Sequence, residues 1–200
     1  FRSLLGKSTN YFPQPDTLPF RLLSLTAISG EFPTSQLNRL PASPYYLEAV
    51  VTALKKAGLL RTYYRDRLRG YRLGIKAKSA LLDGWPERFT FCLTGDAETN
   101  RLKSEANRRF RLHRLAETYI TMGNAGVLLY PDEKPKVFAQ TGFGGEAVTY
   151  PVFYSSREVK ELGADATQIR SSRFAGVLLV PTGIFVTYNS GGALMKWRYK

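Results

Sequence analysis

The chain has 200 residues, of which 44% are hydrophobic and 22% charged, and its formal net charge is +13. This length allows one large domain or two small ones, and the hydrophobic content is enough for ordinary cores, which excludes an intrinsically disordered chain. The cationic excess predicts a polyanionic partner, and nucleic acid fits it better than an anionic membrane surface. The excess is uneven, because residues 1–80 contain 13 Lys/Arg against 4 Asp/Glu, whereas residues 81–200 contain 16 against 12.

Cysteine and histidine are almost absent, since Cys92 and His113 are the single residues of their types. These counts exclude an internal disulfide framework, a Cys/His zinc cluster and the metal triad of a relaxase, so we expect no cofactor. We expect His113 to be a core residue with a hydrogen-bond partner. No apolar run reaches the roughly 18 to 20 residues that span a bilayer, and no secretory signal opens the chain. A cytoplasmic protein without a membrane partner is therefore expected.

The first elements are predicted in the order helix, short helix, helix. Residues 1–16 end in a proline-rich run, which indicates a flexible arm. Asp16 or Thr17 is expected to cap a helix that stops at Gly30. A short helix is predicted next, over residues 34–40. This order is the one expected ahead of a DNA-binding hairpin.

An amphipathic helix is predicted to begin at Pro44 and to stop at Gly58. Ser43 supplies its N-cap and Pro44 its first-position proline. Two runs rich in Tyr and Leu, residues 59–64 and 69–73, then flank a short polar tip, which predicts a β-hairpin. The apolar face of the helix follows the i, i+3, i+4, i+7 pattern and consists of Leu47, Val50, Val51 and Leu54.

Together these elements predict a winged helix-turn-helix domain over residues 17–83. Its second long helix would recognise DNA, and cations on the helix and on the hairpin, the wing, would contact phosphates on either side of a groove. The alternative is a small α+β core with a solvated basic face. The expected DNA-contacting residues are Tyr45, Tyr46, Thr52, Lys55, Lys56, Arg61, Arg65, Arg67, Arg69, Arg72, Lys76 and Lys78.

One run carries a resemblance to a known class of proteins. Leu54 to Leu60 reads LKKAGLL, and Tyr71-Arg72-Leu73-Gly74 follows it. This resembles the winged-helix signature of bacterial and archaeal transcription regulators, in which leucine, a basic pair, alanine, glycine and leucine precede the first wing strand. The resemblance covers about residues 17–82 and implies the fold, without indicating the DNA target.

The break at residues 83–86 is taken as a domain boundary, so that residues 84–200 form a second α+β domain with a long helix and a mainly antiparallel sheet. Its expected role is dimerisation or partner contact. Helices are predicted at residues 97–122 and 155–162, strands at 89–93, 127–130, 136–139, 149–154, 174–180, 184–188 and 194–199, and a glycine-rich linker at 140–146.

The alternative activity is that of a metal-dependent DNA nuclease. Asp132 follows a predicted strand, and Glu158 and Lys160 come later in the chain, an order that resembles the Pro-Asp … Glu-x-Lys motif of restriction-type nucleases. In that motif two carboxylates hold a divalent cation, here Mg²⁺, at the scissile phosphate, and the lysine positions or activates water. The motif needs Glu and Lys on a strand, whereas residues 155–162 have the pattern of a helix.

A second resemblance covers most of the chain loosely. Arg111-Leu112-His113-Arg114-Leu115 and Tyr130-Pro131-Asp132 resemble the replication-relaxation proteins of plasmids and other mobile elements. In that family a winged helix precedes a long helix with Leu, His and Arg residues and an α/β domain related to the nucleases, here degenerate because the acidic strand motif is missing.

The sequence therefore predicts a non-catalytic protein that binds double-stranded DNA. The expected role is that of a transcription regulator, or of a replication or transfer accessory factor of a mobile element, with a homodimer as the expected assembly. A protein-interaction module is the second alternative, and the salt dependence of binding separates the two.

Overall fold

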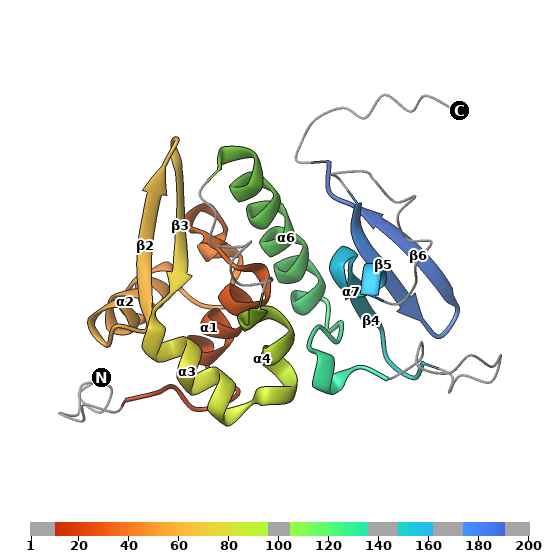
Figure 1. Cartoon of the computed structure of the whole chain (residues 1–200), viewed down its shortest axis with the longest axis horizontal. Coiled ribbons are helices and arrows are strands. Elements are labelled where there is room, and N and C mark those ends of the chain that lie inside the picture. Colours follow the sequence, from red (N-terminus) through yellow and green to blue (C-terminus); the bar gives the residue numbers. More distant parts are fainter. Residues whose placement is uncertain (1–10, 96–104, 136–147, 162–173, 191–200) are drawn as a thin grey trace. The chain divides into compact units, whose positions relative to one another are not determined.

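The computed structural model describes residues 11–95, 105–135, 148–161 and 174–190 (Figure 1). Contacts divide the chain into two compact units, Phe1–Ala116 and Glu117–Lys200. Each unit combines helices with a three-stranded antiparallel sheet, which confirms the predicted α+β class. Within the described ranges, no helix has both the length and the apolar composition needed to cross a membrane.

The first unit consists of helices around a sheet with the strand order β1-β3-β2 (Figure 1). The helix α6 (Ala106–Asn124) begins in this unit and continues into the second. The preceding elements are α1 (Leu18–Ser29), β1 (Phe32–Pro33), the 3₁₀ helix η2 (Thr34–Arg39), α2 (Pro44–Lys56), β2 (Leu60–Arg65), β3 (Leu68–Leu73), α3 (Ile75–Gly84) and α4 (Pro86–Leu93).

The ends of α1 and α2 are set by the residues that the sequence indicated. The Thr17 hydroxyl accepts a hydrogen bond from the Phe20 amide, and Gly30 adopts a φ of 83° after the last turn of α1. The Ser43 hydroxyl accepts from the Tyr46 amide at 3.3 Å, ahead of Pro44. The predicted apolar face of α2 is buried in full, so this helix is fixed on the core along one side only.

The hairpin formed by β2 and β3 is paired in register up to Arg65 and Leu68. Asp66 and Arg67 form the two-residue connection, with φ values of 52° and 60°. Positive φ at both central positions is the mark of a type I′ turn, whose twist matches that of the flanking strands. The predicted hairpin is confirmed, and we call residues 65–68 the hairpin tip.

Residues 89–93 were predicted as a strand, and this prediction is wrong, because they belong to α4. Pro86 occupies the first turn, and Phe89, Cys92 and Leu93 form one buried helical face. α4 packs on both α1 and α3. The contacts therefore divide the chain after Ala116, whereas the sequence placed the boundary at residue 84.

The second unit has the strand order β4-β5-β6. Tyr119 of α6 meets Phe153 edge to face, and Val152, Tyr154 and Leu179 form a buried cluster. The predicted strands at 149–154, 174–180 and 184–188 correspond to strands of this sheet, whereas residues 127–130 contribute a single parallel bridge, Leu128 to Val152. The predictions for residues 136–139, 140–146 and 194–199 lie outside the described ranges. The elements are η3 (Pro131–Glu133), β4 (Val152–Ser155), α7 (Ser156–Glu161), β5 (Phe174–Val180) and β6 (Gly183–Tyr188).

Candidate nucleic-acid interface

The exposed side of α2 carries the predicted base-reading residues. Tyr45 is 74% exposed, Thr52 is exposed, and Tyr46 is half-buried. Lys55 and Lys56 are exposed in the last turn, where cations also interact favourably with the helix dipole. The helix therefore presents aromatic and hydroxyl groups towards its N-terminal end and positive charge at its C-terminal end.

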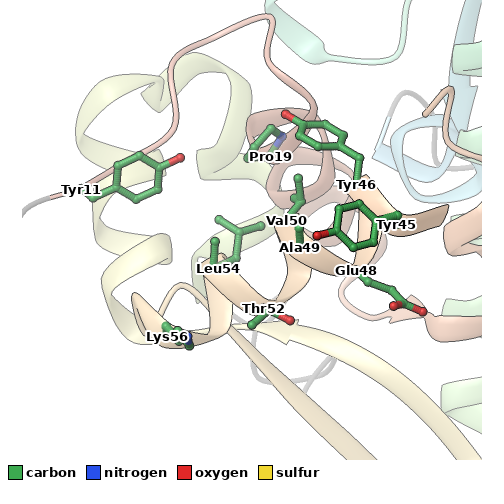
Figure 2. Close-up of a pocket in the computed structure, with 11 residues that line it drawn as sticks. Tyr11, Pro19, Tyr45, Tyr46, Glu48, Ala49, Val50, Thr52, Leu54 and Lys56 are labelled. Atoms are coloured by element: carbon green, nitrogen blue, oxygen red, sulfur yellow. The ribbon is translucent and has the colours of Figure 1, made fainter. Parts of the chain in front are cut away.

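A pocket of roughly 350 Å³ lies along α2, where Tyr11 and Pro19 also line it (Figure 2). Most of its lining is apolar, and Tyr45 and Tyr46 are among the residues that form it. A volume of this size is at the lower end of the range for ligand pockets. The remaining lining residues are Glu48, Ala49, Val50, Thr52, Ala53, Leu54 and Lys56.

The hairpin presents most of the predicted cations to solvent. Arg61, Arg65, Arg67 and Arg69 are exposed. Arg65 also forms an ion pair with Asp66, at 3.7 Å between Nε and Oδ2, and an exposed pair of this kind adds little to stability. On α3, which follows the hairpin, Lys76 is exposed and Lys78 is half-buried.

Arg72 was predicted to lie on the surface of the hairpin, and this prediction is wrong. The residue is only 3% exposed, and its Nε donates to Glu31 Oε2 at 2.8 Å. The reason is register: Arg72 pairs with Arg61 in the ladder and lies on the sheet face that also carries Gly70, which packs against Glu31. Arg72 stabilises the hairpin from within and is removed from the list of expected DNA contacts.

A buried ionic cluster stands behind the hairpin, formed by Glu31, Arg72, Arg109 and His113, and we call it the Glu31 cluster. Glu31 and Arg109 are both 0% exposed. The Arg109 guanidinium donates to the carboxylate through Nε and Nη2, and His113 Nε2 lies 2.8 Å from Oε1. Three cationic or polar donors thus converge on one carboxylate from β3 and α6.

This environment decides the protonation of Glu31. Burial alone would raise the pKa of the carboxyl, but hydrogen bonds from His113, Arg109 and Arg72 outweigh burial and lower the pKa from 4.5 to about 2. Glu31 is therefore charged at neutral pH. The charged carboxylate stabilises the fold, because it compensates the positive charge of the buried Arg109 guanidinium.

Arg109 also contacts the backbone of the hairpin tip. Its Nη1 donates to the carbonyl of Arg65 at 2.6 Å, and its Nη2 donates to the carbonyl of Leu68 at 3.0 Å and to that of Tyr63 at 3.4 Å. Its Cζ lies 4.7 Å from the centre of the Tyr63 ring. One guanidinium of α6 therefore connects Glu31 to both strands of the hairpin where they enter the turn.

The sequence did not indicate Glu31 or Arg109, and it indicated His113 only as a core residue with a partner. Two signals were present: Arg109 and His113 have the i, i+4 spacing of one helix face, and Glu31 directly follows the glycine that ends α1. Neither signal says which carboxylate meets which cations, because the contacts join residues 78 and 82 positions apart.

Comparisons of the chain with protein-family models, with curated proteins and with solved structures find no match. The function is therefore inferred from the surface and its chemistry.

The residues of the nuclease alternative lie in the second unit. Asp132 is in η3, and Glu158 and Lys160 are in α7, so the predicted helix is confirmed in place of the strand that the motif requires. Glu158 Oε2 accepts from the Ser155 amide and hydroxyl, each at 2.7 Å, which forms a capping box. Glu158 Oε1 accepts from the buried Lys134 ammonium.

Both carboxylate oxygens of Glu158 thus have structural partners. Burial lowers the pKa of Lys134, and Glu158 opposes this shift. Among the residues that the structure describes, no three Asp, Glu, His or Cys side chains are grouped so that they could hold a metal ion. The surface of the first unit presents exposed arginine, lysine and tyrosine side chains, residue types that are able to bind phosphates and to contact bases.

Proposed function

We propose that residues 17–83 form a winged helix-turn-helix domain that binds double-stranded DNA without catalytic activity of its own. The observation that carries the proposal is the exposed side of α2 beside a hairpin whose tip presents Arg65 and Arg67 to solvent. The order of helix, strand, short helix, helix and hairpin supports it, as does the strand order β1-β3-β2.

The two elements offer different kinds of contact. Tyr45 and Thr52 on α2 provide an aromatic ring and a hydroxyl that can meet base edges in a major groove. The arginines of the hairpin and the lysines at the end of α2 provide charge for phosphates, which fixes position without reading sequence. The net charge of +13 is consistent with a substantial phosphate-contacting surface.

The biological role that we propose is that of a cytoplasmic transcription regulator, or of a replication or transfer accessory factor of a mobile element. This role depends on the resemblances to winged-helix regulators and to replication-relaxation proteins. The engagement of Glu158 with Ser155 and Lys134 favours a non-catalytic protein over the nuclease alternative.

Fluorescence anisotropy with a labelled duplex of random sequence, titrated at several salt concentrations, tests DNA binding. We expect affinity to fall steeply with salt, and the double variant Arg65→Ala/Arg67→Ala to reduce the slope of log K against log salt by about 2, because each lost phosphate contact removes roughly one counterion. The matched control is Arg157→Ala/Lys160→Ala in α7, which removes the same charge from the second unit and should leave the slope unchanged.

Two results would contradict the proposal. Affinity independent of salt would favour the protein-interaction alternative. Equal losses in the hairpin variant and in the α7 variant would mean that net charge, and not the hairpin, determines binding.

For the second unit we propose self-association into a homodimer. β6 is the outer strand of the sheet as described, and Ile184, Phe185, Val186 and Tyr188 are exposed on it. An outer strand with apolar side chains is suited to pairing with another strand. Sedimentation velocity should find a dimer for the parent chain and a monomer for Phe185→Lys, whereas a monomeric parent chain would contradict this role.

A further inference from the structure

The hairpin tip contains two non-glycine residues in the left-handed region, Asp66 and Arg67. A type I′ turn requires this conformation and aspartate tolerates it, but it is unfavourable for arginine, so Arg67 needs surroundings that hold it. The third strand of the sheet, β1, pairs with β3 only at Gly70 and Tyr71, so the tip itself is two-stranded, and two strands alone are marginally stable. The tip therefore needs contacts from outside the hairpin.

Arg109 supplies those contacts. It donates to the carbonyls of Arg65 and Leu68, the two residues that flank the turn, so it links the end of β2 to the start of β3. The exposed cations Arg65 and Arg67 are two of the four residues of this tip. Their positions in space consequently follow from where Arg109 places the backbone.

Glu31 fixes the orientation of Arg109. The carboxylate takes the Nε and Nη2 side of the guanidinium, which leaves Nη1 and the remaining Nη2 proton directed to the hairpin carbonyls. Only the planar guanidinium, with donors on two sides, can bind the carboxylate and both hairpin carbonyls at once. The compact ammonium of a lysine cannot reach all three groups. Gly70 completes the fit, because a Cβ atom there would lie 2.4 Å from Glu31 Oε1.

We propose that Glu31 and Arg109 are positioning residues for DNA binding: without contacting DNA, they hold the hairpin tip in the conformation in which Arg65 and Arg67 meet phosphates. The DNA part of this inference rests on the proposed function. Within the described part of the chain, the Glu31–Arg109 pair contacts the hairpin and not α2. Phosphate contacts made by the hairpin should therefore depend on this pair, and contacts made by α2 should not.

The first experiment measures amide hydrogen exchange in the full chain, without DNA, for Arg109→Lys and for a matched control, Arg111→Lys, on the exposed side of the same helix. In Arg109→Lys we expect hairpin amides to exchange about tenfold faster or more, as expected where a local opening becomes easier, while α2 keeps its protection. The control should match the parent chain. Unchanged exchange of the hairpin amides would overturn the proposal. Equal acceleration throughout the first unit would also overturn it, because Arg109 would then stabilise the whole unit and not the tip in particular.

The second experiment repeats the anisotropy titration. Arg109→Lys keeps the charge of the chain, yet we expect its affinity to fall about tenfold and its salt slope to decrease by about 2, through the loss of two phosphate contacts. A double-mutant cycle then separates the elements. Arg65→Ala should have little further effect in the Arg109→Lys background, whereas Tyr45→Ala should have the same effect in both backgrounds. Additive effects of Arg65→Ala and Arg109→Lys would overturn the proposal.

The two experiments distinguish the inference from the proposed function. If the parent chain has no salt-dependent affinity for DNA, the proposed function fails, and the exchange data still decide whether Arg109 positions the tip. If Arg109→Lys does not fold, Glu31→Asp takes its place with the same expected results, because it keeps the charge and shortens the carboxylate side chain by one methylene.

Discussion

Glu31→Gln is expected to destabilise the first unit strongly at neutral pH. The substitution keeps the size of the side chain and removes its charge. Arg72 and Arg109 then lose the negative charge of Glu31, and one carboxylate oxygen is replaced by an amide group that donates towards other donors. The loss should therefore exceed that of a single neutral hydrogen bond.

The expected loss of folding stability in Glu31→Gln is about 3 kcal/mol. Lowering the pKa of Glu31 from 4.5 to about 2 corresponds to a preference for the charged form of roughly 3 kcal/mol. Removal of one partner from a buried ion pair typically costs about 3–5 kcal/mol. A loss of about 3 kcal/mol is a large part of the roughly 5–15 kcal/mol that stabilises most native proteins.

The same shift fixes the pH window. Because the folded-state pKa lies below the unfolded one, the contribution of Glu31 is complete above pH 4.5 and is lost as the pH falls towards 2. Urea unfolding followed by far-ultraviolet circular dichroism, at a series of pH values, measures both effects. The parent chain should lose stability over this window, and Glu31→Gln should show a weaker dependence there. A loss below about 1 kcal/mol at pH 7, together with equal acid dependence in the two chains, would refute the reasoning.

Three further predictions concern stability. Gly70→Ala should lower the free energy of unfolding by about 1–3 kcal/mol in urea titrations, because its Cβ would collide with Glu31, whereas Gly84→Ala meets nothing within 4 Å and should be nearly neutral. A chain that ends after α4 should be less stable than one that includes α6, and circular dichroism melting curves that coincide would contradict this. Glu158→Ala should cost about 3 kcal/mol in thermal unfolding, because it removes the carboxylate that pairs with the buried Lys134 ammonium, and an unchanged melting temperature would contradict the buried ion pair.

Local signals in the sequence were sufficient for most of the first unit. Thr17, Ser43 and Gly30 mark helix ends because capping is a contact between near neighbours. The two runs rich in Tyr and Leu mark the hairpin because its strands are joined by a short polar turn. The failure at residues 89–93 is also local: a short apolar run has no decisive period, and Pro86 was the signal that favoured a helix.

The interior of the site could not be predicted in the same way. Arg72 was expected on the surface because arginine side chains are usually exposed. Only the register of β3 and the position of Glu31 place it in the interior. Arg109 was one of several arginines on a predicted helix, and its i, i+4 spacing to His113 does not show that it is buried or which carboxylate it meets. Contacts between residues far apart in the chain follow from packing, which periodicity does not encode.

Because Glu31 fits closely against Gly70, we expect the residues of the Glu31 cluster and Gly70 to be retained or lost together in evolution. A side chain at position 70 would displace the carboxylate, and loss of the carboxylate would remove the negative charge that Arg72 and Arg109 share, so we expect a change at one position to be accompanied by changes at the others. In a divergent relative we expect either the whole set or none of it. An acidic residue after a helix-ending glycine, Gly-x-Arg in the second hairpin strand and Arg-x-x-x-His in a later helix form a pattern that can identify such relatives where overall similarity has faded.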